Sequence, residues 1–182
     1  MARSVYLTMV VLMGCASGSA SLPSATTRSR TTIETTTGKY TVEQVTTPDV
    51  MKQALPASLD AVWAALPAAY GDLHIPIDGI DPSSHMIGSG NITAQGSFAG
   101  THLSRLLDCG VGAVGTQNAD RFEVHLNVRT QLTANASGGT LVQTLIEATA
   151  RDAGTSTSAV RCSTTGMLER RIAEVLAKET KK

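Results

Sequence analysis

Three cysteines are the residues of this 182-residue chain whose chemistry constrains it most, and they lie far apart, at positions 15, 109 and 162. With no CxxC or HxxxH pair beside them, they lack the spacing of a zinc site. A thiol nucleophile is one interpretation, because Cys109 lies close in sequence to His102 and Asp108, and a catalytic thiolate needs a histidine and an orienting group. A structural disulfide and an attachment site are the other two.

Other motifs that suggest chemistry are better explained as loops and turns. The run "GVGAVG" (110–115) matches a dinucleotide-binding pattern, but that pattern lies between a strand and a helix, whereas this run follows Cys109 and precedes a predicted strand. Asp78 and Asp81 could act as paired acids, yet "PIDGIDPSS" is typical of a turn. The four histidines show no ligand spacing. We therefore expect no cofactor, no metal and no catalysis.

The N-terminus has the features of an export signal. Arg3 is the only charged residue among the first 14, and the apolar stretch 5–13 is too short to cross a bilayer. It ends in Leu-Met-Gly-Cys15, which resembles the lipobox of bacterial lipoproteins, where the cysteine is lipidated and the chain is cleaved before it. The resemblance covers about 15 residues and implies a lipid anchor at Cys15 in the cell envelope. Ala16 favours the outer membrane, facing the periplasm. An ordinary secretory signal is the alternative.

A lipidated Cys15 would leave Cys109 and Cys162 as a pair in an oxidising compartment. Their bond would close a loop of about 54 residues and stabilise the fold by about 4 kcal/mol in the chain-entropy model. Two unpaired buried thiols are the competing interpretation.

The mature chain divides into a tether and a domain. Residues 15–29 are rich in Ser, Thr and Ala and indicate a flexible tether after the signal peptide 1–14; residues 30–180 form a single domain. Its first segment, 30–47, alternates in a way that predicts a hairpin turning at Thr37–Lys39, with a longer linker as the alternative. Asp81–Ser84 predicts the turn of a second hairpin, and a short helix is expected around 102–107.

Two longer helices are predicted from apolar residues at helical spacing. Ser58 can cap the first, and Pro67 should kink it or end it early, with Gly71 as a stop. The apolar stripes are Leu59, Val62, Trp63, Leu66 and Tyr70 in the first helix, and Leu168, Ile172, Val175 and Leu176 in the second.

Three strands lie between these helices. The stretch "RFEVHLNVRTQL" (121–132) alternates apolar and polar residues, with only Thr130 interrupting the apolar series. "TLVQTLIEATAR" (140–151) and "AVRCST" (159–164) follow, the latter with Val160 and Cys162 inward. The pattern predicts an α+β fold: a two-layer sandwich of an antiparallel sheet with two main helices on one face.

The other face of that sheet is the candidate interaction surface, with Arg121, His125, Arg129 and Arg151 as its probes. Fifteen basic and fifteen acidic residues cancel, so no charge excess points to nucleic acid. The plan of a lipidated cysteine, a tether and a small α+β domain resembles small envelope lipoproteins, some of which are accessory subunits of the outer-membrane barrel-assembly machinery. That resemblance transfers no functional residues.

The expected function is a lipid-anchored envelope protein of non-catalytic binding or assembly type, whose partner is an envelope protein or a cell-wall component. One alternative is a carrier of lipid or another apolar molecule, in a cavity lined by Trp63, Phe122 and Leu126. An envelope hydrolase is the second alternative.

Overall fold

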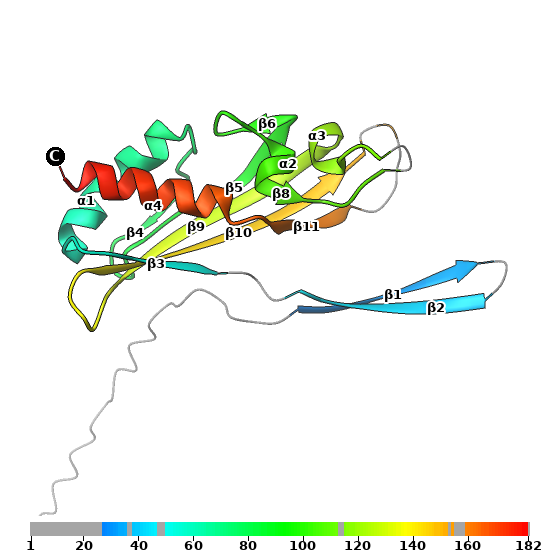
Figure 1. The fold of residues 1–182 in the computed structure, drawn as a ribbon, viewed down its shortest axis with the longest axis horizontal. Coiled ribbons are helices and arrows are strands. Elements are labelled where there is room, and N and C mark those ends of the chain that lie inside the picture. Colours follow the sequence, from blue (N-terminus) through cyan, green and yellow to red (C-terminus); the bar gives the residue numbers. More distant parts are fainter. Residues whose placement is uncertain are drawn as a thin grey trace, which may run out of the picture.

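The computed structural model describes residues 27–35, 38–46, 50–112, 115–152, 154 and 159–181. The predicted signal peptide, Cys15 and most of the predicted tether lie outside them. The elements, drawn in Figure 1, are β1 (Thr27–Thr35), β2 (Gly38–Thr46), β3 (Met51–Leu55), α1 (Leu59–Asp72), β4 (Gly79–Asp81), β5 (Met86–Gln95), β6 (Ser97–Phe98), β7 (Thr101–His102), α2 (Leu103–Leu106), β8 (Leu107–Asp108), α3 (Asn118–Arg121), β9 (Glu123–Ala134), β10 (Thr140–Arg151), β11 (Val160–Thr164) and α4 (Met167–Glu179).

The first two strands form the predicted hairpin rather than a linker. β1 and β2 are antiparallel, from the pair Thr27 and Thr46 to the pair Thr35 and Gly38. The hairpin therefore begins within the last residues assigned to the tether. Gly38 and Lys39, which were predicted to lie in the turn, are paired residues of β2.

The main sheet is antiparallel and is built around β9 and β10, two strands of 12 residues each. Across it the strands follow in the order β7-β6-β5-β9-β10-β11-β8, while β4 pairs with β5 and β3 pairs with β10. β3 and β11 share one edge of β10: β3 pairs with residues 140–144 and β11 with residues 148–150.

The two main helices, α1 and α4, pack against each other and contact this sheet, as Figure 1 shows. Four apolar side chains on the inner face of β9 are buried: Val124, Leu126, Val128 and Leu132. The predicted α+β fold, with two main helices and an antiparallel sheet, is thus confirmed.

Helix α1 begins as predicted but does not end as predicted. The Ser58 hydroxyl accepts a hydrogen bond from the Ala61 N–H, which caps the helix. Pro67 neither ends nor shortens it, and the helix continues past Gly71 to Asp72. Pro67 is exposed to solvent, so water can satisfy the carbonyl that its missing N–H leaves unpaired, while the neighbouring Leu66 stays buried against the core.

The predicted starts of two strands, β9 and β11, also need correction. Residues 118–121 form the short helix α3, Phe122 caps it, and β9 starts only at Glu123. Val160, expected to face inward, is 41% exposed because it is the first residue of β11, at the end of the sheet. Cys162, two residues later, is buried as predicted.

A buried polar link joins α1 to the two central strands. Thr130, the residue that interrupts the apolar series of β9, is fully buried; the Tyr70 hydroxyl donates to its Oγ1 at 2.9 Å. The hydroxyls of Thr130 and Thr144 lie 3.1 Å apart, on β9 and β10. Burial of Tyr70 raises its pKa above the ordinary value, so its hydroxyl stays protonated and remains a donor.

We predict that Thr130→Val lowers the free energy of unfolding by about 1–3 kcal/mol, because it removes the contact of the Thr144 hydroxyl and leaves the Tyr70 hydroxyl with the longer bond to the Ile87 carbonyl, at 3.5 Å. Urea unfolding followed by circular dichroism measures the loss. Thr133→Val, at a half-buried position of the same strand, is the matched control and should change stability by no more than about 0.5 kcal/mol. Equal losses in both variants would contradict the role of the buried link.

Candidate functional site

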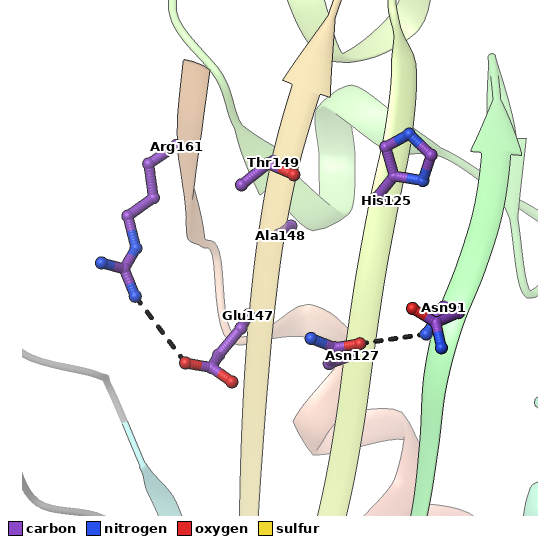
Figure 2. A pocket seen from close by; sticks show the side chains of 7 residues that line it. All are labelled: Asn91, His125, Asn127, Glu147, Ala148, Thr149 and Arg161. Atoms are coloured by element: carbon purple, nitrogen blue, oxygen red, sulfur yellow. Dashed lines mark hydrogen bonds and ion pairs between the residues drawn. The ribbon is translucent and has the colours of Figure 1, made fainter. Parts of the chain in front are cut away.

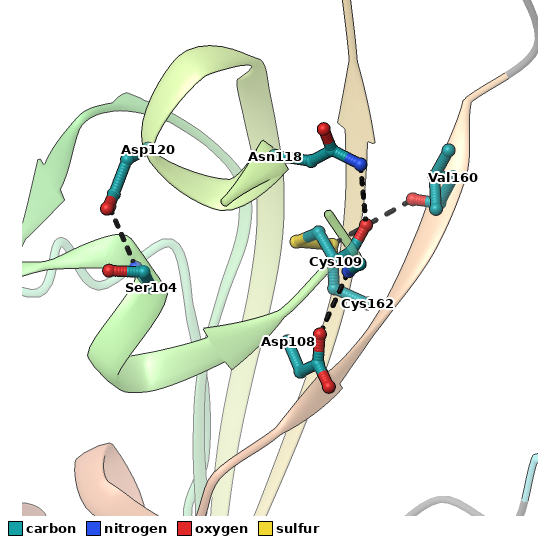
Figure 3. The surroundings of a disulfide bond; sticks show 8 residues. Ser104, Asp108, Cys109, Asn118, Asp120, Val160 and Cys162 are labelled. Atoms are coloured by element: carbon teal, nitrogen blue, oxygen red, sulfur yellow. Dashed lines mark hydrogen bonds between the residues drawn. A yellow bond between two sulfur atoms is a disulfide. The ribbon is translucent and has the colours of Figure 1, made fainter. Parts of the chain in front are cut away.

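Cys109 and Cys162 are joined by a disulfide, shown in Figure 3, with their Cα atoms 4.2 Å apart. The bond connects the residue after β8 to the middle of β11, and both cysteines are buried. The predicted pairing is confirmed. Because its sulfur is in the disulfide, Cys109 has no thiol to act as a nucleophile beside His102.

Polar side chains near the disulfide hold the surrounding loop (Figure 3). The Asn118 amide donates to the carbonyl of Cys109 at 3.2 Å, and the Asp108 carboxylate accepts from the Gly110 N–H at 2.9 Å. Downstream, the Gly112 N–H donates to the Thr116 carbonyl, so the glycine-rich run folds back on itself before the four-residue helix α3. In this setting the glycines form a loop beside the disulfide.

The predicted pair of acids is engaged in local structure. The Asp81 carboxylate accepts hydrogen bonds from Ser83 Oγ at 2.6 Å and Ser84 Oγ at 2.7 Å, which lower the pKa of Asp81 to about 2. Asp78 Oδ2 accepts from the Gly90 N–H at 2.6 Å. Both residues therefore stabilise turns and backbone, as the alternative interpretation of this segment expected.

Polar residues form aligned rows on the sheet face opposite α1 and α4, which we call the outer face. Thr93, His125, Thr149 and Arg161 lie opposite one another on β5, β9, β10 and β11. Asn127 and Glu147 lie opposite each other in the next row. Because strands are rigid and pair at fixed spacing, each row presents its side chains at set distances.

These two rows line a shallow pocket of about 360 Å³, which we call the central pocket (Figure 2). The lining residues belong to β5, β9, β10 and β11. Its lining residues are Asn91, His125, Asn127, Glu147, Ala148, Thr149 and Arg161.

A β-bulge in β5 shapes one rim of this pocket. The register with β9 shifts between Ser89 and Ile92, and Asn91 has a φ of 56°, in the left-handed region. The Asn91 N–H donates to Asn127 Oδ1 at 3.1 Å (Figure 2). Because the side-chain oxygen of Asn127 accepts this bond, the NH₂ group of Asn127 is available to donate to another group.

The charged groups of the pocket are held by weak contacts. Arg161 and Glu147 approach to 3.7 Å, with side chains 41% and 33% exposed. His125 Nε2 lies 3.2 Å from Glu123 Oε1, and His125 Nδ1 lies 3.3 Å from Thr93 Oγ1. Exposed ion pairs contribute about 0–1 kcal/mol to stability, so these groups can exchange partners at little cost.

The structure places the four predicted surface residues differently from one another. His125 lines the central pocket, and Arg129 lines a second pocket of about 340 Å³ beside β4. Arg151 is exposed and lies opposite Glu123 at the end of β10. The predicted place of Arg121 on the sheet is wrong: it belongs to α3, and its guanidinium donates to Thr116 Oγ1 at 3.2 Å.

The outer face is not exposed throughout. Gln131, predicted to face solvent, is buried, and its amide donates to the Ser84 carbonyl at 3.4 Å. Leu145, opposite Arg129, is also buried on this face.

Several pocket residues were not singled out from the sequence. A glycine inside an alternating stretch signals a bulge, and "SGN" at 89–91 carries that signal, which would have drawn attention to Asn91. Thr149 and Arg161 carry none, because they enter the pocket only through the pairing of β9 with β10 and of β10 with β11.

No protein-family model, curated protein or solved structure matches this chain. In the part of the chain that the structure describes, no three His, Cys, Asp or Glu residues are placed to hold a metal ion. None of the described helices has the length and apolar character that a membrane crossing requires. Fold and site together define a disulfide-linked α+β domain with a polar pocket on the outer face of its sheet.

We predict that replacing both Cys109 and Cys162 with Ala lowers the free energy of unfolding by about 4 kcal/mol, because the bond closes a long loop, with a sequence separation of 53 between its cysteines. Urea unfolding of the oxidised chain and of the double variant measures the difference. In a Cys15→Ser background, thiol titration of the unfolded, unreduced chain should find no free thiol. Two free thiols, or equal stability, would contradict the structural role of the bond.

Proposed function

We propose that this chain is an exported, lipid-anchored protein of the bacterial cell envelope, and that its domain binds a partner through the outer face of its sheet. The observation that carries this proposal is the central pocket. Polar side chains from β5, β9, β10 and β11 converge there on strands whose spacing is fixed by backbone pairing. Polar groups held on rigid elements are what specific recognition requires.

The disulfide supports the location outside the cytoplasm. Disulfides persist in oxidising compartments such as the periplasm and are rare in the cytosol. The bond between Cys109 and Cys162 therefore agrees with an export signal at the N-terminus. The lipobox-like residues that end at Cys15 supply the anchor in this proposal, and the polar residues that follow them supply the distance between membrane and domain.

The site favours binding over the two alternative functions. For a hydrolase, Cys109 is engaged in the disulfide, and Asp78 and Asp81 are engaged in hydrogen bonds to their own loops. For a carrier of apolar molecules, Leu126 is packed in the core, and neither outer-face pocket is lined by Trp63, Phe122 or Leu126.

The anchor can be tested in bacterial cells. We predict that the wild-type chain fractionates with membranes and that its N-terminal fragment carries acyl chains by mass spectrometry. Cys15→Ser should abolish both, since the thiol is the acylated group. Cys162→Ser, which keeps the lipobox, is the matched control and should retain the lipid. Wild-type chain without lipid, or a Cys15→Ser variant that stays acylated, would contradict the anchor.

The outer face can be tested by photo-cross-linking in the same cells. A photoreactive residue at Thr149, on the outer face, is expected to give a discrete adduct, whereas one at Glu174, exposed on α4, should not. Arg161→Glu should reduce the Thr149 adduct at least tenfold because it reverses a charge in the pocket. Arg170→Glu, an equal change on α4, should leave it intact. If the Thr149 adduct is unchanged by Arg161→Glu, binding at this face is contradicted.

A further inference from the structure

We propose that the central pocket binds a free amino-acid centre, meaning a carbon that carries both an ammonium and a carboxylate group. A peptide presents such a centre where one of its amino acids is joined through the side chain. This inference rests on the proposed function, in which the outer face is the binding face. It adds the chemical class of the group that is recognised there.

The first argument is the pair of opposite charges in the pocket. Glu147 and Arg161 lie 3.7 Å apart, and both side chains are partly exposed. A ligand whose ammonium approaches Glu147 and whose carboxylate approaches Arg161 would replace one weak ion pair with two charge-assisted pairs. The planar guanidinium fork of Arg161 suits a carboxylate in particular. A zwitterionic centre matches both charges at once, whereas a singly charged ligand would leave one side chain without its partner.

The second argument is the neutral polar groups beside these charges. The Asn127 NH₂ group is a donor, because its oxygen is engaged by the Asn91 N–H. The exposed hydroxyl of Thr149 can donate and accept, and it lies on β10 two residues from Glu147. Amide and hydroxyl groups of this kind complement the N–H and C=O groups of a peptide.

The pocket lining also argues against other ligand classes. Among the described residues that line the central pocket there is no Phe, Tyr or Trp, so the imidazole of His125 is the one ring on which a base or a sugar could stack. Among the described residues of the lining, Arg161 is the only Lys or Arg, and Glu147 lies beside it, so these side chains do not supply the positive charge that a phosphate group favours. A peptide bearing a free amino-acid centre fits the lining best.

The test is an NMR titration of the unlipidated Cys15→Ser chain with Nε-acetyllysine, which combines a free amino-acid centre with a peptide-like amide. Saturable shifts are expected at the backbone amides of Asn91, Asn127, Thr149 and Arg161. Blocking the ammonium by acetylation, or the carboxylate by amidation, should each weaken binding at least tenfold.

Two variants assign each charge to its partner. In Glu147→Gln, acetylating the ammonium should no longer weaken binding, and in Arg161→Gln, amidating the carboxylate should no longer do so. Both side chains are partly exposed, so both variants should fold, which the dispersion of their spectra verifies. Arg129→Gln, outside the central pocket, is the matched control and should leave the affinity unchanged.

Equal shifts with free and blocked compounds, shifts confined to the second pocket, or no shifts at all would overturn the inference. If Nε-acetyllysine fails to bind while the Arg161-dependent cross-link from Thr149 persists, the ligand class is wrong and the outer face remains the binding face. If the cross-link fails as well, the proposed function is wrong with it.

Discussion

The antiparallel pairing of β9 with β10 is the constraint on which the rest of the structure depends. The two strands pair along their full length, from Ala134 opposite Thr140 to Glu123 opposite Arg151. Side chains alternate between the two faces of a strand, so a shift of one residue would turn the core face toward solvent and bury the charged face. Such a shift would place His125 and Arg129 beneath the helices. The register thus decides both where the core lies and where the polar pocket lies.

The inner face maintains this register by packing and by one polar link. Apolar side chains of β9 lie against α1, while α4 contacts β10 and β3, and an unpaired hydroxyl in this interface would be costly. The Tyr70 hydroxyl donates a hydrogen bond to Thr130 across the helix–sheet interface. The Thr144 hydroxyl, on β10, is hydrogen-bonded to Thr130 as well. The link therefore couples one helix to both central strands in a single arrangement. β11 pairs with β10 over only three residues, and the disulfide fixes it to the residue that follows β8.

On the outer face, the β-bulge in β5 shapes the central pocket. The bulge in β5 interrupts regular pairing, and Asp78 and Asn127 accept the N–H groups of Gly90 and Asn91 there. Irregular backbone is tolerated in a sheet when side chains satisfy the freed groups. The result brings Asn91 of β5 into the lining of the same pocket as Glu147 of β10 and Arg161 of β11. The side chains of the central pocket are thus supported by a sheet whose other face forms the core, which keeps their spacing constant.

The sequence by itself determined the elements whose signals are local. Alternation over 121–132 predicted a half-buried strand, and an apolar stripe after Ser58 predicted a capped helix, because residue spacing within one element decides which side chains share a face. The cysteine count, together with the lipobox-like N-terminus, also predicted the disulfide. Local rules failed where the environment decides: Pro67 lies within α1 because its side of the helix is exposed to solvent, and Arg121 lies in α3 rather than on the sheet. Only the tertiary structure placed Asn91, Asn127, Glu147 and Arg161 around one pocket, because their proximity depends on the register of four strands and on a bulge, and strand register is set by contacts between residues far apart in the chain.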